Sequence, residues 1–176
     1  LEFAGLNVPI QWPKRTGIGV KDDLLKKAIG FKKSIPLKVL DLTGGLFRDS
    51  HHMAIMGCQV TALEEVAELA NAFIQLLKDD PVKHFDIIHT KSETFLEKLE
   101  ANAFDVIYFD PMFELSRGKS LSQKSMQILH DVAGVDDLGK SIALLQKLKE
   151  SSKRVVVKRA LKASSLDPKV QMSFEG

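Results

Sequence analysis

The sequence of 176 residues has a single cysteine, Cys58, and no long hydrophobic run. One cysteine cannot form a disulfide within the chain, and no Cys and His residues have the spacing of a zinc site. A membrane-spanning helix needs about 20 consecutive apolar residues, and a signal peptide needs a basic and then apolar start; the sequence has neither. These absences predict a cytoplasmic protein with no metal site.

Hydrophobic residues make up 44% of the chain, enough for one packed core. The net charge is only +2, but it is divided into +4 over residues 1–36, −8 over 37–115 and +6 over 116–176. An acidic middle between basic ends suits a protein that holds a small ligand centrally and a polyanion along its flanks. Solvated lysine-rich helices would give the same pattern, so charge alone does not identify a nucleic-acid-binding protein.

Short apolar, β-branched runs alternate with segments of helical period. The runs predict strands at 37–42, 59–63, 85–89, 104–109 and 154–158. Apolar residues at helical spacing predict helices over 66–77, after a Ser92 cap and after Ser141. This alternation predicts an α/β fold, a doubly wound, Rossmann-like domain with a mostly parallel sheet over residues 37–176. Residues 1–36 show no clear strand pattern and are interpreted as a short, basic N-terminal arm or flap.

The residues that follow each predicted strand are the candidates for a ligand site, because the crevice of an open parallel sheet lies beyond the carboxyl ends of its strands. After the first strand, Asp41 leads into Gly44 and Gly45, which allow a tight turn and the close approach of a ligand. The second strand ends at Glu64, where a carboxylate can accept hydrogen bonds from ribose hydroxyls. Each feature alone is common in α/β proteins; together and in this order they favour a nucleoside-cofactor site. The complete G-x-G-x-x-G fingerprint of dinucleotide binding is absent.

The next two strands are followed by further polar groups. Lys91 and Ser92 come after the third strand, where they can reach an adenine edge. The fourth strand ends in Asp110-Pro111-Met112-Phe113. Asp110 and the Pro111 carbonyl can accept the two hydrogens of an exocyclic amine on a planar base, while Phe113 stacks on its ring. The alternative is an Asp-Pro turn that closes the strand, with Phe113 in the core.

At these residues the chain resembles the ribosomal RNA small subunit methyltransferase J family, bacterial class I S-adenosylmethionine-dependent enzymes that methylate guanine N2. The resemblance rests on segments 14–19, 41–49, 57–64 and 108–113, on Lys119, Ser120 and Lys124, and on 154–159. The chain departs from the family at Phe47, where glycine is usual, at Glu65, where a basic residue is usual, and at Lys91, where a small polar residue is usual. We expect Phe47 to narrow the mouth of the pocket. The chain stops at Phe174-Glu175-Gly176, about where a last strand of this fold would form, so we expect its C-terminus to be cut short.

The resemblance implies that S-adenosylmethionine is the cofactor and that small-subunit ribosomal RNA, alone or in the subunit, is the substrate. By resemblance, cofactor contacts fall at Arg48, Asp49, Glu64, Glu65, Lys91, Ser92 and Asp110, beside the Asp41, Gly44 and Gly45 turn. Catalysis is assigned to Asp110, Pro111 and Phe113, which would orient the amine for direct in-line methyl transfer. The candidate phosphate contacts are Lys14, Arg15, Arg117, Lys119, Lys124, Lys158 and Arg159.

Two other classes of protein share parts of this pattern. A nicotinamide-dependent oxidoreductase would use the glycine turn and Glu64 but would leave Asp110 to Phe113 without a role. A non-catalytic RNA-binding module with a decayed cofactor pocket would account for the departures at Phe47 and Lys91.

Overall fold

The computed structural model describes residues 2–3, 6–7, 12, 20–111, 138–159, 167, 169–170 and 172–174. Two short N-terminal strands, β1 (Glu2–Phe3) and β2 (Leu6–Asn7), pair antiparallel. The other strands are β3 (Lys38–Asp41), β4 (Gln59–Glu64), β5 (Phe85–His89), β6 (Val106–Phe109) and β7 (Val155–Val157). The helices are α1 (Val20–Ile29), α2 (Arg48–Ile55), α3 (Ala67–Lys78), α4 (Ser92–Leu96) and α6 (Leu138–Ser151).

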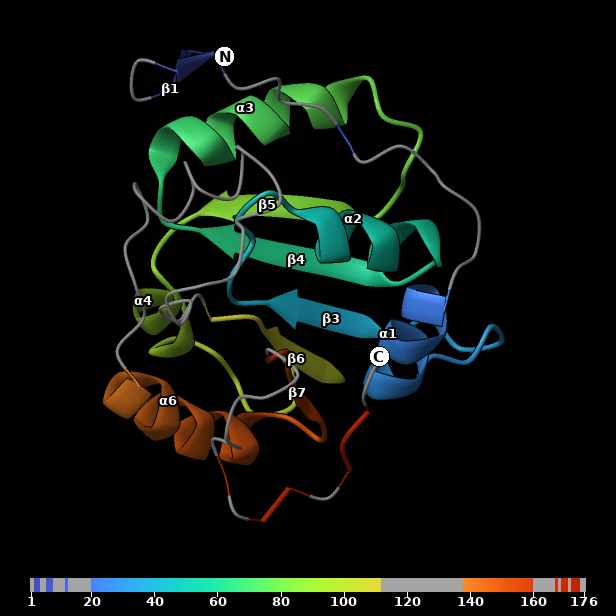
Figure 1. Cartoon of the computed structure of the whole chain (residues 1–176), viewed down its shortest axis with the longest axis vertical. Helices are drawn as coiled ribbons and strands as arrows, with labels where there is room; N and C mark the ends of the chain where they lie inside the picture. The colour runs from blue at the N-terminus through green and yellow to red at the C-terminus, as the bar shows by residue number, and fades with distance from the viewer. Residues whose placement is uncertain are drawn as a thin grey trace, which may run out of the picture.

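The main sheet has the strand order β5-β4-β3-β6-β7, and every neighbouring pair is parallel (Figure 1). From central β3 the chain runs outward through β4 to β5 and then returns to build β6 and β7 on the other side. The order therefore reverses between β3 and β6, and the carboxyl ends of these two strands form the topological switch point. The predicted fold class and the five predicted strands are confirmed.

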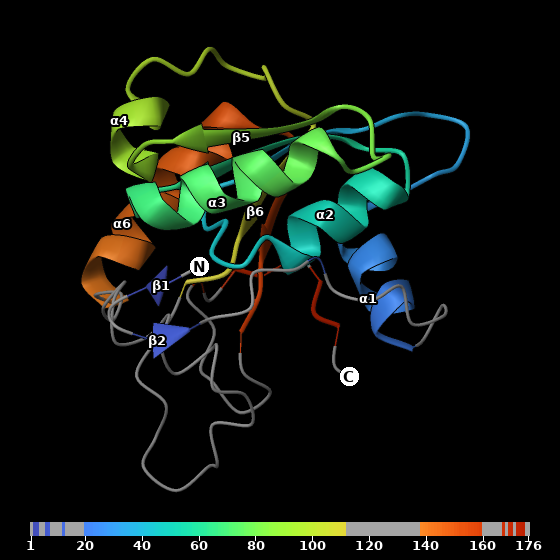
Figure 2. The same ribbon diagram turned by 90° about the horizontal axis from the view of Figure 1, so that it is seen from above.

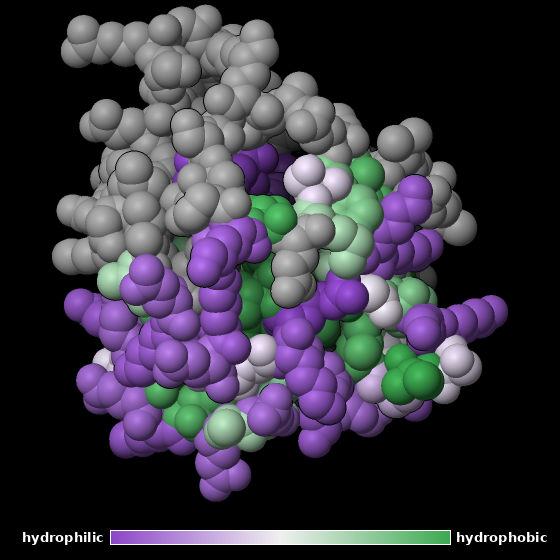
Figure 3. Space-filling view, turned by 90° about the horizontal axis from the view of Figure 1, so that it is seen from below, coloured by the Kyte–Doolittle hydropathy of each residue, from purple (hydrophilic) through white to green (hydrophobic). Residues whose placement is uncertain are grey.

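Alternation along the strands divides the core between the two faces of the sheet. Val39 and Val106 belong to one cluster, to which α1, α2 and α3 contribute Ile29, Met53 and Phe73, and the residue before α2 contributes Phe47. Leu40 and Ile107, each one residue further along, belong to the other cluster, which includes Leu96 of α4 and Leu148 of α6. Figure 2 shows α2 and α3 next to each other, and both pack on the β4 and β5 half of the sheet. The described surface in Figure 3 is mostly hydrophilic, with smaller hydrophobic areas between.

The first 36 residues contain elements that the sequence pattern did not predict. Helix α1 buries Ile29 in the core, and Arg154 Nη1 donates to the Ala28 carbonyl at 2.9 Å. Trp12 stacks on His51 with ring centroids 4.2 Å apart and also contacts Phe73. These parts of the segment therefore pack on the α/β domain, and Trp12 has a packing role.

Two predicted helix starts differ from the structure. Lys91 is the N-cap of α4, without a side-chain cap bond, and Ser92 is the first helical residue. Its hydroxyl donates instead to the Leu42 carbonyl at 2.6 Å, so a tertiary partner replaces the expected local one. Ser141 lies inside α6, which begins at Leu138. Among the described residues, no helix is long and apolar enough to cross a membrane.

Candidate active site

The loops that follow β3 and β6 are hydrogen-bonded to each other at the switch point. Asp41 and Tyr108 are register partners in the two strands, and Leu42 N donates to the Tyr108 carbonyl at 3.0 Å. One step further, the backbone N–H of Asp110 donates to the Thr43 hydroxyl at 2.7 Å. Parallel pairing thus brings Asp110 to the start of the glycine loop, 67 residues away in the sequence.

The glycine loop, residues 43–47, is pinned against the end of β4. Gly44 N donates to the Leu63 carbonyl at 2.8 Å, and Gly45 N donates to Glu64 Oε2 at 2.8 Å. A Cβ atom added at Gly44 would clash with the Phe47 ring and lie 2.8 Å from the Leu63 carbonyl oxygen, so the close approach requires glycine. Gly45 has a φ of 52°, in the left-handed region.

Phe47 also has a φ of 52°, and its side chain is fully buried. Its ring lies 5.0 Å from that of Phe73 and 6.4 Å from that of Phe85. The expectation that Phe47 narrows the mouth of the pocket is therefore wrong, because the left-handed backbone turns the ring into the core.

Glu64, at the end of β4, is buried and accepts two backbone hydrogen bonds. Oε2 accepts from Gly45 N and Oε1 accepts from Val66 N, both at 2.8 Å. Burial raises the pKa of Glu64, although the two backbone hydrogen bonds oppose the rise. The carboxylate fixes the glycine loop, and its further lone pairs can accept ribose hydroxyls.

Asp41 is the most buried carboxyl of the site, with 2% of its surface exposed. Oδ1 accepts from Thr43 N at 2.9 Å, and Oδ2 accepts a short hydrogen bond from the Ser50 hydroxyl of α2. Burial raises the pKa of Asp41 to about 6, despite these hydrogen bonds and with a further contribution from the charges of Asp49 and Asp110. Asp41 thus joins β3, the glycine loop and α2.

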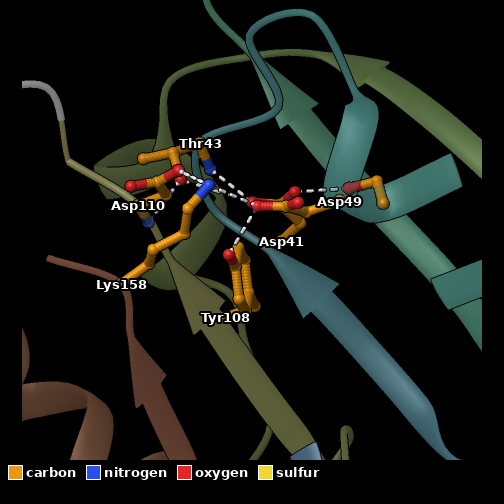
Figure 4. A network of polar contacts seen from close by, with 7 residues as sticks. Asp41, Thr43, Asp49, Tyr108, Asp110 and Lys158 are labelled. Carbon is orange, nitrogen blue, oxygen red and sulfur yellow. Dashed lines mark hydrogen bonds and ion pairs between the residues drawn. The ribbon is translucent and has the colours of Figure 1, made fainter. Parts of the chain in front are cut away.

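A second group of polar side chains lies beside Asp41. Lys158 Nζ contacts Asp49 Oδ2 at 2.7 Å and Asp110 Oδ2 at 2.8 Å, and Tyr108 Oη donates to Asp49 Oδ2 at 2.6 Å. Figure 4 shows these side chains converging from α2, from β6 and from the residues that follow β6 and β7. We call Asp49, Tyr108, Asp110 and Lys158 the lysine cluster.

Within the lysine cluster, the pKa values of Asp49 and Lys158 shift against the direction that burial alone would give. Burial acts to raise the pKa of Asp49, but the charge and hydrogen bond of Lys158 and the hydrogen bond of Tyr108 outweigh it and lower the pKa. Burial acts to lower the pKa of Lys158, but Asp110 and Asp49 raise it. Both groups are therefore held in their charged forms.

The other predicted site residues lie in different environments. Arg48, Glu65 and Lys91 are exposed near the strand ends, whereas Pro111 is buried and Arg159 is half-buried. The Ser92 hydroxyl donates to the Leu42 carbonyl. Outside the described residues lie Phe113, Lys14, Arg15, Arg117, Lys119 and Lys124.

Sequence reasoning missed three residues of the site, Thr43, Ser50 and Tyr108. All are polar and lie within or next to the segments already singled out, but only the tertiary contacts reveal their partners. Among the described residues, no group of three His, Cys, Asp or Glu side chains is arranged to hold a metal ion.

A parallel sheet with carboxylates and a glycine loop at its switch point defines the class of Rossmann-like, nucleoside-cofactor-binding α/β domains. The fold is similar to that of a SAM-dependent methyltransferase from Neisseria gonorrhoeae, with a TM-score of 0.57 and 23% sequence identity. That similarity covers 81% of this chain and 57% of the other. It shows the fold alone.

The chain belongs to a family described as putative SAM-dependent methyltransferase, whose model matches residues 8–176. Two curated relatives are each named Ribosomal RNA small subunit methyltransferase J. The protein of Buchnera aphidicola is 36% identical over 160 residues, covering 85% of this chain and 64% of the relative. The protein of Dechloromonas aromatica is 36% identical over 167 residues, covering 90% of this chain and 68% of the relative. The resemblance inferred from the sequence is confirmed, and the chain spans about two thirds of the length of these relatives.

Proposed function

We propose that the protein is an S-adenosylmethionine-dependent methyltransferase that acts on the exocyclic N2 amine of a guanosine in small-subunit ribosomal RNA. The observation that carries the proposal is the position of Asp110 at the switch point, bonded through its backbone to Thr43 of the glycine loop. This places a hydrogen-bond acceptor for the target amine beside a nucleoside-cofactor site. Family membership favours this reaction over the oxidoreductase alternative.

The described residues suit the cofactor that the family name specifies. Glu64 is a buried carboxylate whose pKa is raised by burial, and hydroxyl donors from a ribose would offset that loss of solvation. Gly44 leaves no room for a side chain, so the loop lies directly against Phe47 and the Leu63 carbonyl; we assign the methionine portion of the cofactor to this loop. Near adenine we assign Lys91 and Ser92, the latter through its backbone. When bound, the cofactor supplies a methyl group on a positively charged sulfonium.

The residues of the chain would act on the target base mainly by orienting it. Asp110 and the Pro111 carbonyl accept the two hydrogens of the amine, which aims the nitrogen lone pair, and Phe113 stacks on the base. A guanine within a duplex must first be extruded, at a cost of a few kcal/mol. After methylation the amine loses one proton, for which the Asp110 carboxylate or water is the acceptor.

For the RNA backbone we propose contacts from basic residues outside the cofactor loop. They are Lys14, Arg15, Arg117, Lys119, Lys124 and Arg159, with the role of Lys158 considered below. The partner is the small ribosomal subunit or its naked RNA, and the location that follows from this partner is the bacterial cytoplasm.

The test is the transfer of labelled methyl from S-adenosylmethionine to unmodified small ribosomal subunits and to their naked RNA, followed by nucleoside digestion. We expect label in N2-methylguanosine, and the better of the two substrates identifies the natural form. Label in another nucleoside would overturn the assigned target. No label with either substrate, while S-adenosylhomocysteine and RNA both bind, would favour the non-catalytic RNA-binding module.

A further inference from the structure

Lys158 contacts several parts of the candidate site. Its backbone N–H donates to the Phe109 carbonyl at 2.9 Å, which fixes the residue beside the end of β6. Its side chain then reaches Asp110, directly after β6, and Asp49, in the first turn of α2. One ammonium group thus joins three segments that are far apart in the sequence (Figure 4).

We propose that Lys158 is a positioning residue of the methyl-transfer reaction, which orients the Asp110 carboxylate toward the target amine and couples it to Asp49 on the cofactor side. This inference rests on the function proposed above. It gives Lys158 a role different from the phosphate contact that a basic segment alone predicts.

The first argument is the charge of the site. Asp41, Asp49 and Asp110 lie close enough that the charges of Asp49 and Asp110 raise the pKa of Asp41. Lys158 is the group that lowers the pKa of Asp49 most strongly, and its contact with Asp110 Oδ2 is equally short. Removing this cation would leave three carboxylates that repel one another, so that one would take up a proton or rotate away.

The second argument is geometric. A carboxylate beside the reacting atoms must be held in orientation as well as in charge, because small misplacements of an orienting group are costly to the rate. The backbone of Asp110 is fixed by its bond to Thr43, and Lys158 adds a contact at the side-chain end. Asp49, the other partner of Lys158, is fixed in turn by Tyr108, whose Oη donates to Asp49 Oδ2 at 2.6 Å.

The experiment compares the wild type with Lys158→Met, Lys158→Arg and a control, Lys153→Met. The control removes an exposed lysine that precedes β7, at the opposite end of the strand from Lys158. For Lys158→Met we expect kcat for methyl transfer to fall by up to about 100-fold, with KM for RNA changed less than about twofold. Lys158→Arg should restore part of kcat, and Lys153→Met should match the wild type. An unchanged kcat with a raised KM and a weaker salt dependence would overturn the proposal in favour of a phosphate contact.

A second measurement separates this inference from the proposed function. Carboxyl ¹³C resonances of Asp49 are followed by NMR during a pH titration of the wild type and of Lys158→Met. The titratable neighbours are Asp41, His52, Tyr108 and Asp110. We expect the pKa of Asp49 to rise in the variant, and kcat to fall more steeply than in the wild type as the pH decreases.

The outcomes are distinct. If the wild type transfers no methyl group, the proposed function fails, while the titration still tests the ion pairs of Lys158. If Asp49 titrates identically in both proteins, the inference fails whatever the activity. Should Lys158→Met not fold, Lys158→Gln replaces it in both measurements.

Discussion

The two pairs of carboxylates at the switch point are held in different ways. Asp41 and Glu64 accept hydrogen bonds from nearby backbone N–H groups, and Asp41 also accepts from the Ser50 hydroxyl, whereas Asp49 and Asp110 share the ammonium of Lys158. The pKa of each member of the first pair is raised by burial, while that of Asp49 is lowered by Lys158 and Tyr108. At Asp41 and Glu64 the hydrogen bonds only moderate the effect of burial on the pKa, whereas at Asp49 the charge of Lys158, with the hydrogen bond of Tyr108, outweighs it.

The difference separates two tasks. Asp41 and Glu64 fix the loop that we propose binds the cofactor. Asp49 and Asp110, paired with Lys158, place charged groups near the proposed position of the target amine. Four substitutions test this division.

Asp110→Ala should have the largest effect, lowering methyl transfer by about 100-fold or more, since the variant loses a charge-assisted hydrogen bond to the amine. RNA binding should remain close to that of the wild type. Transfer is measured with labelled methyl, and Asp86→Ala, which removes an exposed carboxylate of β5, is the control. Equal turnover in Asp110→Ala would refute the catalytic assignment.

Asp41→Asn should alter how stability depends on pH. Because the pKa of Asp41 is raised from 3.8 to about 6, the folded state binds its proton more tightly than the unfolded state. Its contribution is therefore fully present below pH 3.8 and is lost as the pH rises through about 6, a change of about 3 kcal/mol.

Denaturant unfolding of the wild type and Asp41→Asn at pH 4 to 8 measures this contribution. Relative to the variant, the wild type should lose stability as the pH rises. Asp86→Asn, which removes an exposed charge, should run parallel to the wild type. A constant difference between wild type and Asp41→Asn would show that burial does not raise the pKa of Asp41.

Gly44→Ala should lower the free energy of unfolding by about 1–3 kcal/mol and weaken cofactor binding, because the new methyl group meets the Phe47 ring and the Leu63 carbonyl. Gly57→Ala controls for backbone strain without a steric contact: apart from its chain neighbours, no atom lies within 4 Å of its Cβ position, and its φ is 102°. Thermal unfolding and calorimetry with S-adenosylhomocysteine distinguish the two. Normal binding by Gly44→Ala would show that the loop tolerates displacement.

Glu64→Gln should have the smallest effect of the four, weakening the binding of S-adenosylhomocysteine about tenfold. Gly45 N and Val66 N donate to different carboxylate oxygens of Glu64, and in glutamine one of these oxygens becomes an NH2 group, which cannot accept a hydrogen bond. Glu68→Gln, at an exposed position of α3, is the control for charge. Titration with NADH should give no binding in any of these proteins; tight NADH binding would restore the oxidoreductase alternative.

Part of the site could be predicted from the sequence because it depends on local order. Asp41, Glu64 and Asp110 each end or follow an apolar run, and parallel strands place such residues at one edge. Phe47 could not be predicted, because a left-handed backbone decided whether its ring faced the pocket or the core. Ser92 was misjudged as a cap because its partner, the Leu42 carbonyl, lies 50 residues away in the sequence.

The sequence by itself determined the alternation of strands and helices, the glycine turn and the placing of acidic residues at strand ends, since hydrophobic period and backbone freedom are properties of short segments. Only the tertiary structure decided that Lys158 lies between Asp49 and Asp110. That contact spans 109 and 48 residues of sequence and follows from the pairing of β7 with β6, which no local pattern encodes.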